Sequence, residues 1–196
     1  MLSESEMLDL ITTWLPPSGR VLDVGCGSGH LLTALAERGI SGIGIDPYAG
    51  NSERCRRLRA EEMDQLAEQF DLVYTRYTLH HLGAPQRFPE EARSVLCPGG
   101  ILLIVDWIKG ARTGVPERYL ALQTVVGWVR KAGFQLLLRD VRGQSMVVVG
   151  KLPTAGPEPK ARKSEQYTST KARSKGTQNA NRCQKRYLEH RLKQRY

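Results

Sequence analysis

The sequence predicts an α/β fold in which a doubly wound, mostly parallel sheet closes with an antiparallel hairpin. Three observations predict this fold class. Strand-like apolar segments alternate with segments of helical spacing, one strand-like segment is almost purely aliphatic, and a very short connection joins two apolar segments near residue 150. The 196 residues, 40% of them hydrophobic, suffice for one folded domain with one core.

The first half of the chain is expected to alternate between helix and strand. Ser3 and Glu6 form a capping-box pattern, and apolar residues then recur at helical spacing, so a short helix is expected to end before Pro16. The segments that follow are expected to be a strand at 20–24, a helix at 31–37, a strand at 40–46, a helix at 52–58 and a strand at 70–75.

The second half continues the alternation and ends in the hairpin. A helix is expected at 89–96, a turn at 97–100 and a helix at 125–132. The aliphatic residues 101–105 are typical of a strand covered on both faces. Residues 141–144 are too few for a parallel crossover, so the strands expected at 134–140 and 145–149 must pair antiparallel.

Charge divides the chain near residue 150. Residues 1–150 hold 16 Lys or Arg and 17 Asp or Glu, whereas residues 151–196 hold 13 and 3, within a net charge of +9. We expect a folded domain at 1–150 and a basic, flexible tail at 151–196. The tail is either an arm attracted to nucleic acid or an acidic membrane surface, or a solvated extension without a partner.

Other classes of protein are disfavoured by what the sequence lacks. No apolar segment approaches the roughly 20 residues that span a bilayer, so no transmembrane segment and a cytoplasmic location are expected. The four cysteines lie far apart without a C-x-x-C pair, so no metal site is expected.

A glycine-rich loop at residues 25–29 follows the first expected strand, and its glycines let the backbone approach a ligand closely. His30 stands where a dinucleotide fingerprint has its third glycine, which disfavours a pyrophosphate. Asp23 would also repel a pyrophosphate, but it suits a cation such as a sulfonium or an amino acid. Asp46, 21 residues past Gly25, is placed to accept hydrogen bonds from ribose hydroxyls. Together these residues predict a site for a positively charged nucleoside.

With these features the sequence resembles the class I S-adenosylmethionine-dependent methyltransferases, especially those of the ubiquinone and menaquinone biosynthesis type. Met63 stands where that family usually has alanine. The resemblance implies a Rossmann-like, seven-stranded sheet and an enzyme that methylates a small molecule with S-adenosylmethionine. Five segments carry it in order over residues 7–150: the loop at 21–29, Gly-Ile-Gly-Ile-Asp at 42–46, Glu-Met at 62–63, residues 70–82, and Leu-Cys-Pro-Gly-Gly at 96–100.

The same resemblance implies which residues contact each part of the cofactor. They are Asp23, Gly25, Cys26, Gly27 and Gly29 for the methionine end, Asp46 and Pro47 for the ribose and adenine edge, Glu62 and Met63 for the adenine, and Thr75 and Arg76 for the floor near the sulfonium.

Methyl transfer by in-line displacement chiefly requires alignment of the two reactants and exclusion of water. If the nucleophile carries a proton, His81 is the expected catalytic residue, because an imidazole accepts protons near neutral pH. The alternative is that His81 is a structural histidine bonded to backbone, as is expected of His80. Arg76, Tyr77 and Asp106 are further candidates to face the substrate.

Other functions stay open beside a small-molecule methyltransferase. One is an RNA or protein methyltransferase guided by the basic tail, and another is a noncatalytic nucleic-acid-binding or scaffold protein. A nicotinamide dehydrogenase is disfavoured by His30 and by the terminal hairpin.

Overall fold

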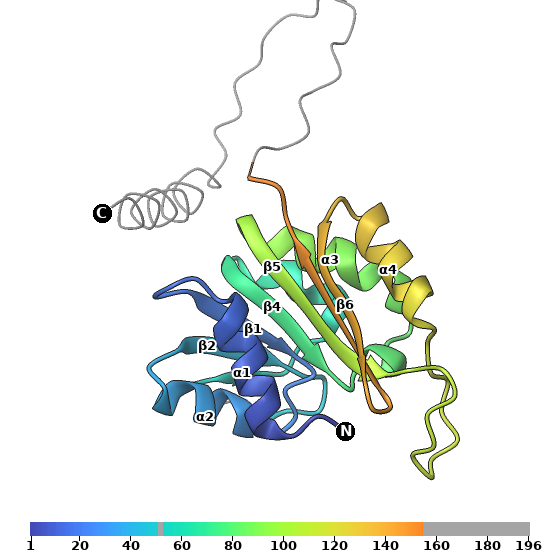
Figure 1. The fold of residues 1–196 in the computed structure, drawn as a ribbon. Helices are drawn as coiled ribbons and strands as arrows, with labels where there is room; N and C mark the ends of the chain where they lie inside the picture. The colour runs from blue at the N-terminus through green and yellow to red at the C-terminus, as the bar shows by residue number, and fades with distance from the viewer. Residues whose placement is uncertain (51–52, 155–196) are drawn as a thin grey trace, which may run out of the picture.

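The computed structural model describes residues 1–50 and 53–154. Its centre is a seven-stranded sheet in the order β3-β2-β1-β4-β5-β7-β6 (Figure 1). Strands β1 to β5 pair in parallel, and β7 is antiparallel to both of its neighbours, which confirms the predicted fold class. The strands are β1 (Arg20–Val24), β2 (Ser41–Ile45), β3 (Cys55–Arg56), β4 (Phe70–Arg76), β5 (Leu96–Trp107), β6 (Gln135–Arg142) and β7 (Ser145–Lys151).

Helices cover both faces of the sheet, with α1 and α2 on one face and α3 and α4 on the other (Figure 1). The predicted capping box is confirmed, since the Ser3 hydroxyl accepts from the Glu6 amide and the Glu6 carboxylate accepts from the Ser3 amide. The α-helices are α1 (Glu4–Trp14), α2 (His30–Glu37), α3 (Phe88–Val95) and α4 (Leu122–Lys131), and the 3-10 helices are η1 (Ala60–Leu66), η2 (Leu79–His81) and η3 (Pro85–Arg87).

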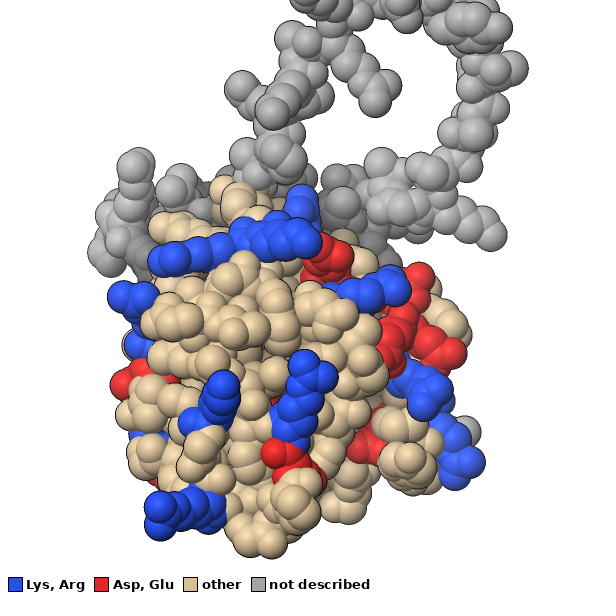
Figure 2. Space-filling model, turned by 90° about the vertical axis from the view of Figure 1, so that its right-hand side faces the viewer, with Lys and Arg blue, Asp and Glu red and all other residues tan. Residues whose placement is uncertain are grey.

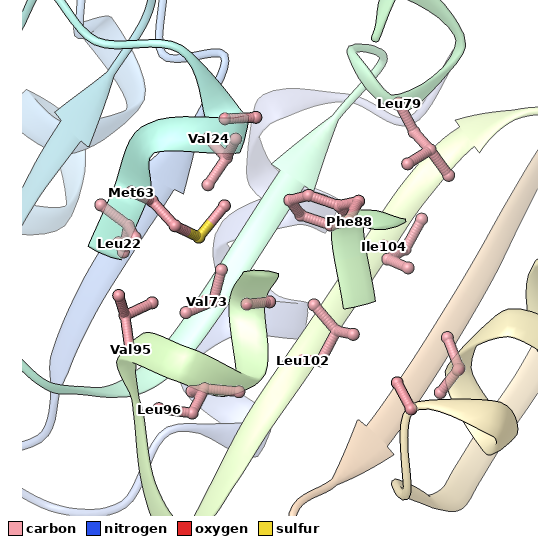
Figure 3. Packing of buried hydrophobic residues seen from close by; sticks show 14 of the residues in the cluster. Leu22, Val24, Met63, Val73, Leu79, Phe88, Val95, Leu96, Leu102 and Ile104 are labelled. Carbon is pink, nitrogen blue, oxygen red and sulfur yellow. The ribbon is translucent and has the colours of Figure 1, made fainter. Parts of the chain in front are cut away.

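The core consists of two apolar layers separated by the sheet. Alternate residues of β5 enter different layers, because successive side chains of a strand point to opposite faces. Leu102 and Ile104 pack in the layer beneath α3, together with Phe88 (Figure 3). Leu103 and Val105 pack in the layer beneath α1 and α2. The aliphatic composition of this strand is therefore explained by burial on both faces.

The prediction of a helix at 52–58 is wrong. Cys55 and Arg56 instead form β3 and pair in parallel with Gly44 and Ile45 of β2. This segment has too few apolar residues for a buried helical stripe, whereas the edge of β2 offers backbone groups that need partners. The Gly44 amide donates to the Arg54 carbonyl over 2.7 Å, which begins this pairing.

The turn expected at 97–100 falls inside the bounds of β5. The pairing of β4 with β5 shifts register there, from Phe70 opposite Leu96 to Leu72 opposite Ile101. Gly99 has a φ of +81°. The Pro-Gly-Gly sequence therefore forms an irregularity within the strand, because proline is tolerated in a sheet at such bulges.

The predicted division at residue 150 lies close to the end of β7 at Lys151. Residues 155–196, and with them the interpretations of the tail, lie outside the described residues. No helix in the described part of the chain has the length and apolar character to cross a membrane.

Candidate active site

The candidate site lies where the strand order reverses. Strands β2 and β3 lie on one side of β1, and β4 and β5 lie on the other. Val24, the last residue of β1, pairs with Ile45 of β2 and Thr75 of β4, so three strand ends meet at one edge. Ligands of open α/β sheets bind in the crevice at such a switch point.

The loop after β1 has a backbone that requires glycine. Gly25, Gly27 and Gly29 have φ angles of +85°, +53° and +79°. A Cβ atom on Gly25 would lie 2.2 Å from Oγ1 of Thr78, whereas a Cβ atom on Gly27 would meet no atom within 4 Å. The Gly25 amide donates to the Ile45 carbonyl over 2.8 Å and fixes the loop above β2. Open space beside Gly27 fits a ligand that approaches the backbone.

Asp23 is a buried carboxyl group at the end of β1, with 4% of its surface exposed. Burial raises its pKa from 3.8 to about 7, although Tyr74 and Arg76 act in the opposite direction. A bound cation would offset the cost of burying this charge. The electrostatics of Asp23 therefore fit an ammonium or sulfonium ligand.

Asp46 extends from the end of β2 over the glycine loop. Its Oδ2 accepts from the Gly27 amide over 3.1 Å, and its Oδ1 accepts from the Tyr48 amide over 2.8 Å. The carboxylate is thus oriented by two backbone groups. Pro47, the other residue predicted to contact the ribose and adenine edge, is exposed next to it.

Among the buried polar atoms of the described residues that lack hydrogen-bond partners, two belong to the last two residues of β4. They are Oγ1 of Thr75 and Nε of Arg76. Unpaired buried polar groups are costly, so they point to a ligand or ordered water. Arg76 is anchored elsewhere, since its Nη2 donates to the Leu2 carbonyl over 3.1 Å.

The predicted adenine contacts lie in η1. The Glu62 carboxylate accepts from the Arg59 amide over 3.2 Å. The Met63 side chain is fully buried and packs among Leu22, Val24 and Val73 (Figure 3). The structure therefore places this side chain in the core and leaves its backbone as the part able to face a ligand.

A buried side-chain pair beyond the cofactor loop is formed by His80 and Asp106. Nδ1 of His80 lies 2.6 Å from Oδ1 of Asp106, and both side chains are buried. Asp106 also accepts from the His80 and Trp107 amides over 2.9 and 2.7 Å. Burial alone would lower the pKa of His80, but Asp106 and Glu117 outweigh burial and raise the pKa above 6.5. Asp106 therefore orients the ring and increases its basicity.

His81, the predicted catalytic residue, lies beside this pair and is far more exposed. Its side chain is 57% exposed, and its Nε2 lies 3.8 Å from Oε1 of Glu117. Nε2 of His80 lies 3.3 Å from the other carboxylate oxygen of Glu117. The sequence predicts a structural role for His80 and a substrate-facing position for Asp106, but it does not predict the direct contact between the two side chains.

A chain of three aromatic rings, Tyr77, Trp107 and Tyr119, begins beside His80. Tyr77 has a φ of +53°, an uncommon conformation for a residue with a side chain, and its hydroxyl shares a hydrogen bond of 2.8 Å with Ser145. Its ring centroid lies 4.6 Å from that of Trp107. The Tyr119 ring meets the His80 ring edge to face at 5.4 Å. Of these rings, that of Tyr119 contacts the His80 ring directly.

Comparison with known proteins supplies the family. A family model described as a methyltransferase domain matches residues 4–139. The ubiquinone biosynthesis O-methyltransferase of Idiomarina loihiensis is 32% identical, and the match covers 59% of this chain and 53% of that protein. The chain spans about half the length of the first curated relatives that it matches.

Two solved structures show the same fold. The [4+2]-cyclase SpnF has a TM-score of 0.64 at 19% identity, covering 76% of this chain and 81% of that one. An S-adenosylmethionine dependent methyltransferase from Mesorhizobium loti has a TM-score of 0.60 at 17% identity, covering 76% and 98%. Through the family model that spans residues 4–139, this chain belongs to the methyltransferase domain family.

Proposed function

We propose that the protein is an S-adenosylmethionine-dependent methyltransferase that acts by in-line displacement on a small-molecule acceptor. The observation that carries the proposal is the glycine loop at the switch point, flanked by the buried Asp23 and the oriented Asp46. Membership in the methyltransferase domain family supports it, and the names of the curated relatives favour a small-molecule acceptor that is methylated on oxygen.

When bound, S-adenosylmethionine supplies a methyl group activated by a sulfonium. Asp23 would hold the cationic methionine end together with the backbone of residues 25–29, and Asp46 and Pro47 would contact the ribose and the adenine edge. Glu62 and the backbone of Met63 would contact the adenine. Thr75 and Arg76 would use their unpaired buried atoms at the floor near the sulfonium.

At the acceptor side, His80 is the better placed proton acceptor. Asp106 fixes a proton on Nδ1 of His80, which leaves Nε2 to accept a proton from an acceptor hydroxyl. Glu117 faces Nε2 in this structure, so an acceptor hydroxyl would take its place there. His81 would contact the acceptor from the more exposed side.

The variant Asp46→Ala tests the cofactor assignment. Loss of the ribose contacts should weaken S-adenosylmethionine binding about tenfold or more, as measured by calorimetry. Asp9→Ala is the matched control, because Asp9 is an exposed aspartate of α1 whose side chain is 70% exposed. Equal affinity of Asp46→Ala and the wild type would refute the assignment.

A further inference from the structure

Asp23 is a buried acid without an ion pair. Within residues 1–50 and 53–154, the buried charged residues are Asp23 and Asp106. In contrast, Lys, Arg, Asp and Glu side chains project into solvent on the face of the molecule shown in Figure 2. Asp106 is paired with His80, but no ion pair in the described part of the chain includes Asp23. Because a buried carboxylate is costly unless donors or charges stabilise it, the groups around Asp23 control its ionisation.

Tyr74 lies next to Asp23 in the sheet. The two residues are register partners on the parallel strands β1 and β4. Val21, two residues before Asp23, packs with Tyr74 in the layer beneath α1 and α2. Residues two apart on a strand point to the same face of the sheet. The Asp23 and Tyr74 side chains therefore leave the sheet on one face, side by side.

The hydroxyl of Tyr74 is a buried donor. Tyr74 is fully buried, and its hydroxyl has no hydrogen-bond partner of good geometry in the described part of the chain. A buried tyrosine hydroxyl normally has such a partner. Burial and the adjacent Asp23 raise the pKa of Tyr74 well above 10, so the phenol keeps its proton. The hydroxyl is therefore a neutral donor held beside a buried carboxyl group.

The other groups that act on Asp23 come from β4, from the end of β2 and from the glycine loop. Burial raises the pKa of Asp23 most, whereas Tyr74 and Arg76 of β4 lower it and Asp46 raises it. Cys26 shares this environment, and burial together with Asp23 raises the pKa of its thiol, so the thiol carries no charge. Tyr74 is thus a neutral group that opposes the effect of burial on Asp23.

We infer that Tyr74 is a positioning residue of the cofactor site, whose hydroxyl donates to the Asp23 carboxylate and holds it ionised for the cationic methionine end of the cofactor. Tyr74 acts through Asp23 and does not itself contact the cofactor. A carboxylate accepts several hydrogen bonds, so this donation leaves Asp23 able to bind the ligand as well. The inference rests on the proposed function, in which the ionised form of Asp23 is the form that binds S-adenosylmethionine.

The variant Tyr74→Phe tests the inference, because it removes the hydroxyl and keeps the ring. Calorimetry on the full chain measures its affinity for S-adenosylmethionine from pH 6 to pH 8.5. Without the donor, Asp23 should lose its proton about one pH unit later than in the wild type. The variant should therefore bind about fivefold more weakly at pH 7 and within about twofold of the wild type at pH 8.5. Titration of the ligand affects both proteins alike, so the ratio of their affinities reports on the protein.

Two further variants separate this effect from a general loss of packing. Tyr119→Phe removes a hydroxyl that bonds Thr113 and Glu117, and it should keep the wild-type pH profile. In the background of Asp23→Asn, the addition of Tyr74→Phe should change the affinity by less than about twofold, because no carboxylate remains. A wild-type pH profile in Tyr74→Phe would overturn the inference, and so would an equal fivefold loss in the Asp23→Asn background.

A measurement without ligand distinguishes failure of this inference from failure of the proposed function. Carbon-detected NMR follows the titration of the Asp23 carboxyl group in the ligand-free full chain, and its signal is assigned by its absence in Asp23→Asn. Tyr74→Phe should raise the pKa of Asp23, and an unchanged pKa would overturn the inference. A wild type that binds no S-adenosylmethionine at any pH would instead refute the proposed function.

Discussion

Asp23 is a carboxyl group whose burial makes its charge sensitive to pH in the neutral range. Burial raises its pKa to about 7, so half of the ligand-free protein carries a neutral Asp23 near that pH. Only the ionised form attracts the cationic methionine end. The burial of Asp23 at the end of β1 therefore affects how tightly the proposed cofactor binds.

This linkage predicts a pH dependence of cofactor affinity. The affinity for S-adenosylmethionine should rise between pH 6 and pH 7.5, because Asp23 loses its proton over this range. Calorimetric titrations across the range measure the rise. Asp23→Asn should bind weakly at every pH and show no such rise, and an unchanged wild-type affinity from pH 6 to pH 7.5 would contradict the role of Asp23.

His80 gives the second prediction at this scale. His80→Gln should slow methyl transfer about 100-fold, because a proton acceptor contributes that much or more, while leaving cofactor affinity unchanged. Incorporation of labelled methyl groups into acceptors from cell extract measures the rate. His81→Gln is the comparison and should have the smaller effect, since its ring is exposed and lacks Asp106 as a partner. A larger loss in His81→Gln would favour the assignment made from the sequence.

Among the elements, those whose sequence carries both an apolar pattern and an end signal were predictable. The helix capped by Ser3, the strand ending at Val24 and the terminal hairpin all formed where expected. The segment at 52–58 did not, because its structure depends on backbone pairing with β2 and not on its own side chains.

The residues of the candidate site also fall into those that the sequence predicts and those that it does not. The glycine loop and Asp46 were predictable, because a local motif places each at a strand end. The His80–Asp106 pair was not assigned, because it forms only when β4 and β5 pair and bring residues 26 positions apart into contact. The buried position of Met63 likewise depends on the packing of η1 beneath the sheet.

The glycine loop gives a prediction at the scale of an element. Gly25→Ala should destabilise the protein by about 2 kcal/mol or more, because positive φ and close packing both oppose a Cβ atom there. That Cβ atom would lie 2.2 Å from the Thr78 hydroxyl oxygen. Urea denaturation measures the loss. Gly27→Ala, with positive φ but open space, should lose less, and equal losses in the two variants would refute the packing argument.

At the scale of the whole molecule, one sheet separates two apolar layers and aligns the functional strand ends. Side chains of β5 pack in both layers, in the layer beneath α3 and α4 and in the layer beneath α1 and α2. The two layers are therefore joined through this strand.

Truncation after Thr154 tests the proposed division of the chain. The shortened protein should keep its thermal transition, because β7 and the hydrogen bond from the Leu152 amide to the Gly100 carbonyl are retained. Scanning calorimetry compares it with the full chain. A lost or strongly lowered transition would mean that residues 155–196 contribute to the folded domain.

Asp23, Asp46 and the glycine loop together form a site for a cationic nucleoside in the proposed function. Calorimetric titration of the intact protein with S-adenosylmethionine and, separately, with NAD⁺ tests it most directly. Saturable binding of S-adenosylmethionine and no measurable binding of NAD⁺ are expected. Binding of NAD⁺ without binding of S-adenosylmethionine would contradict it.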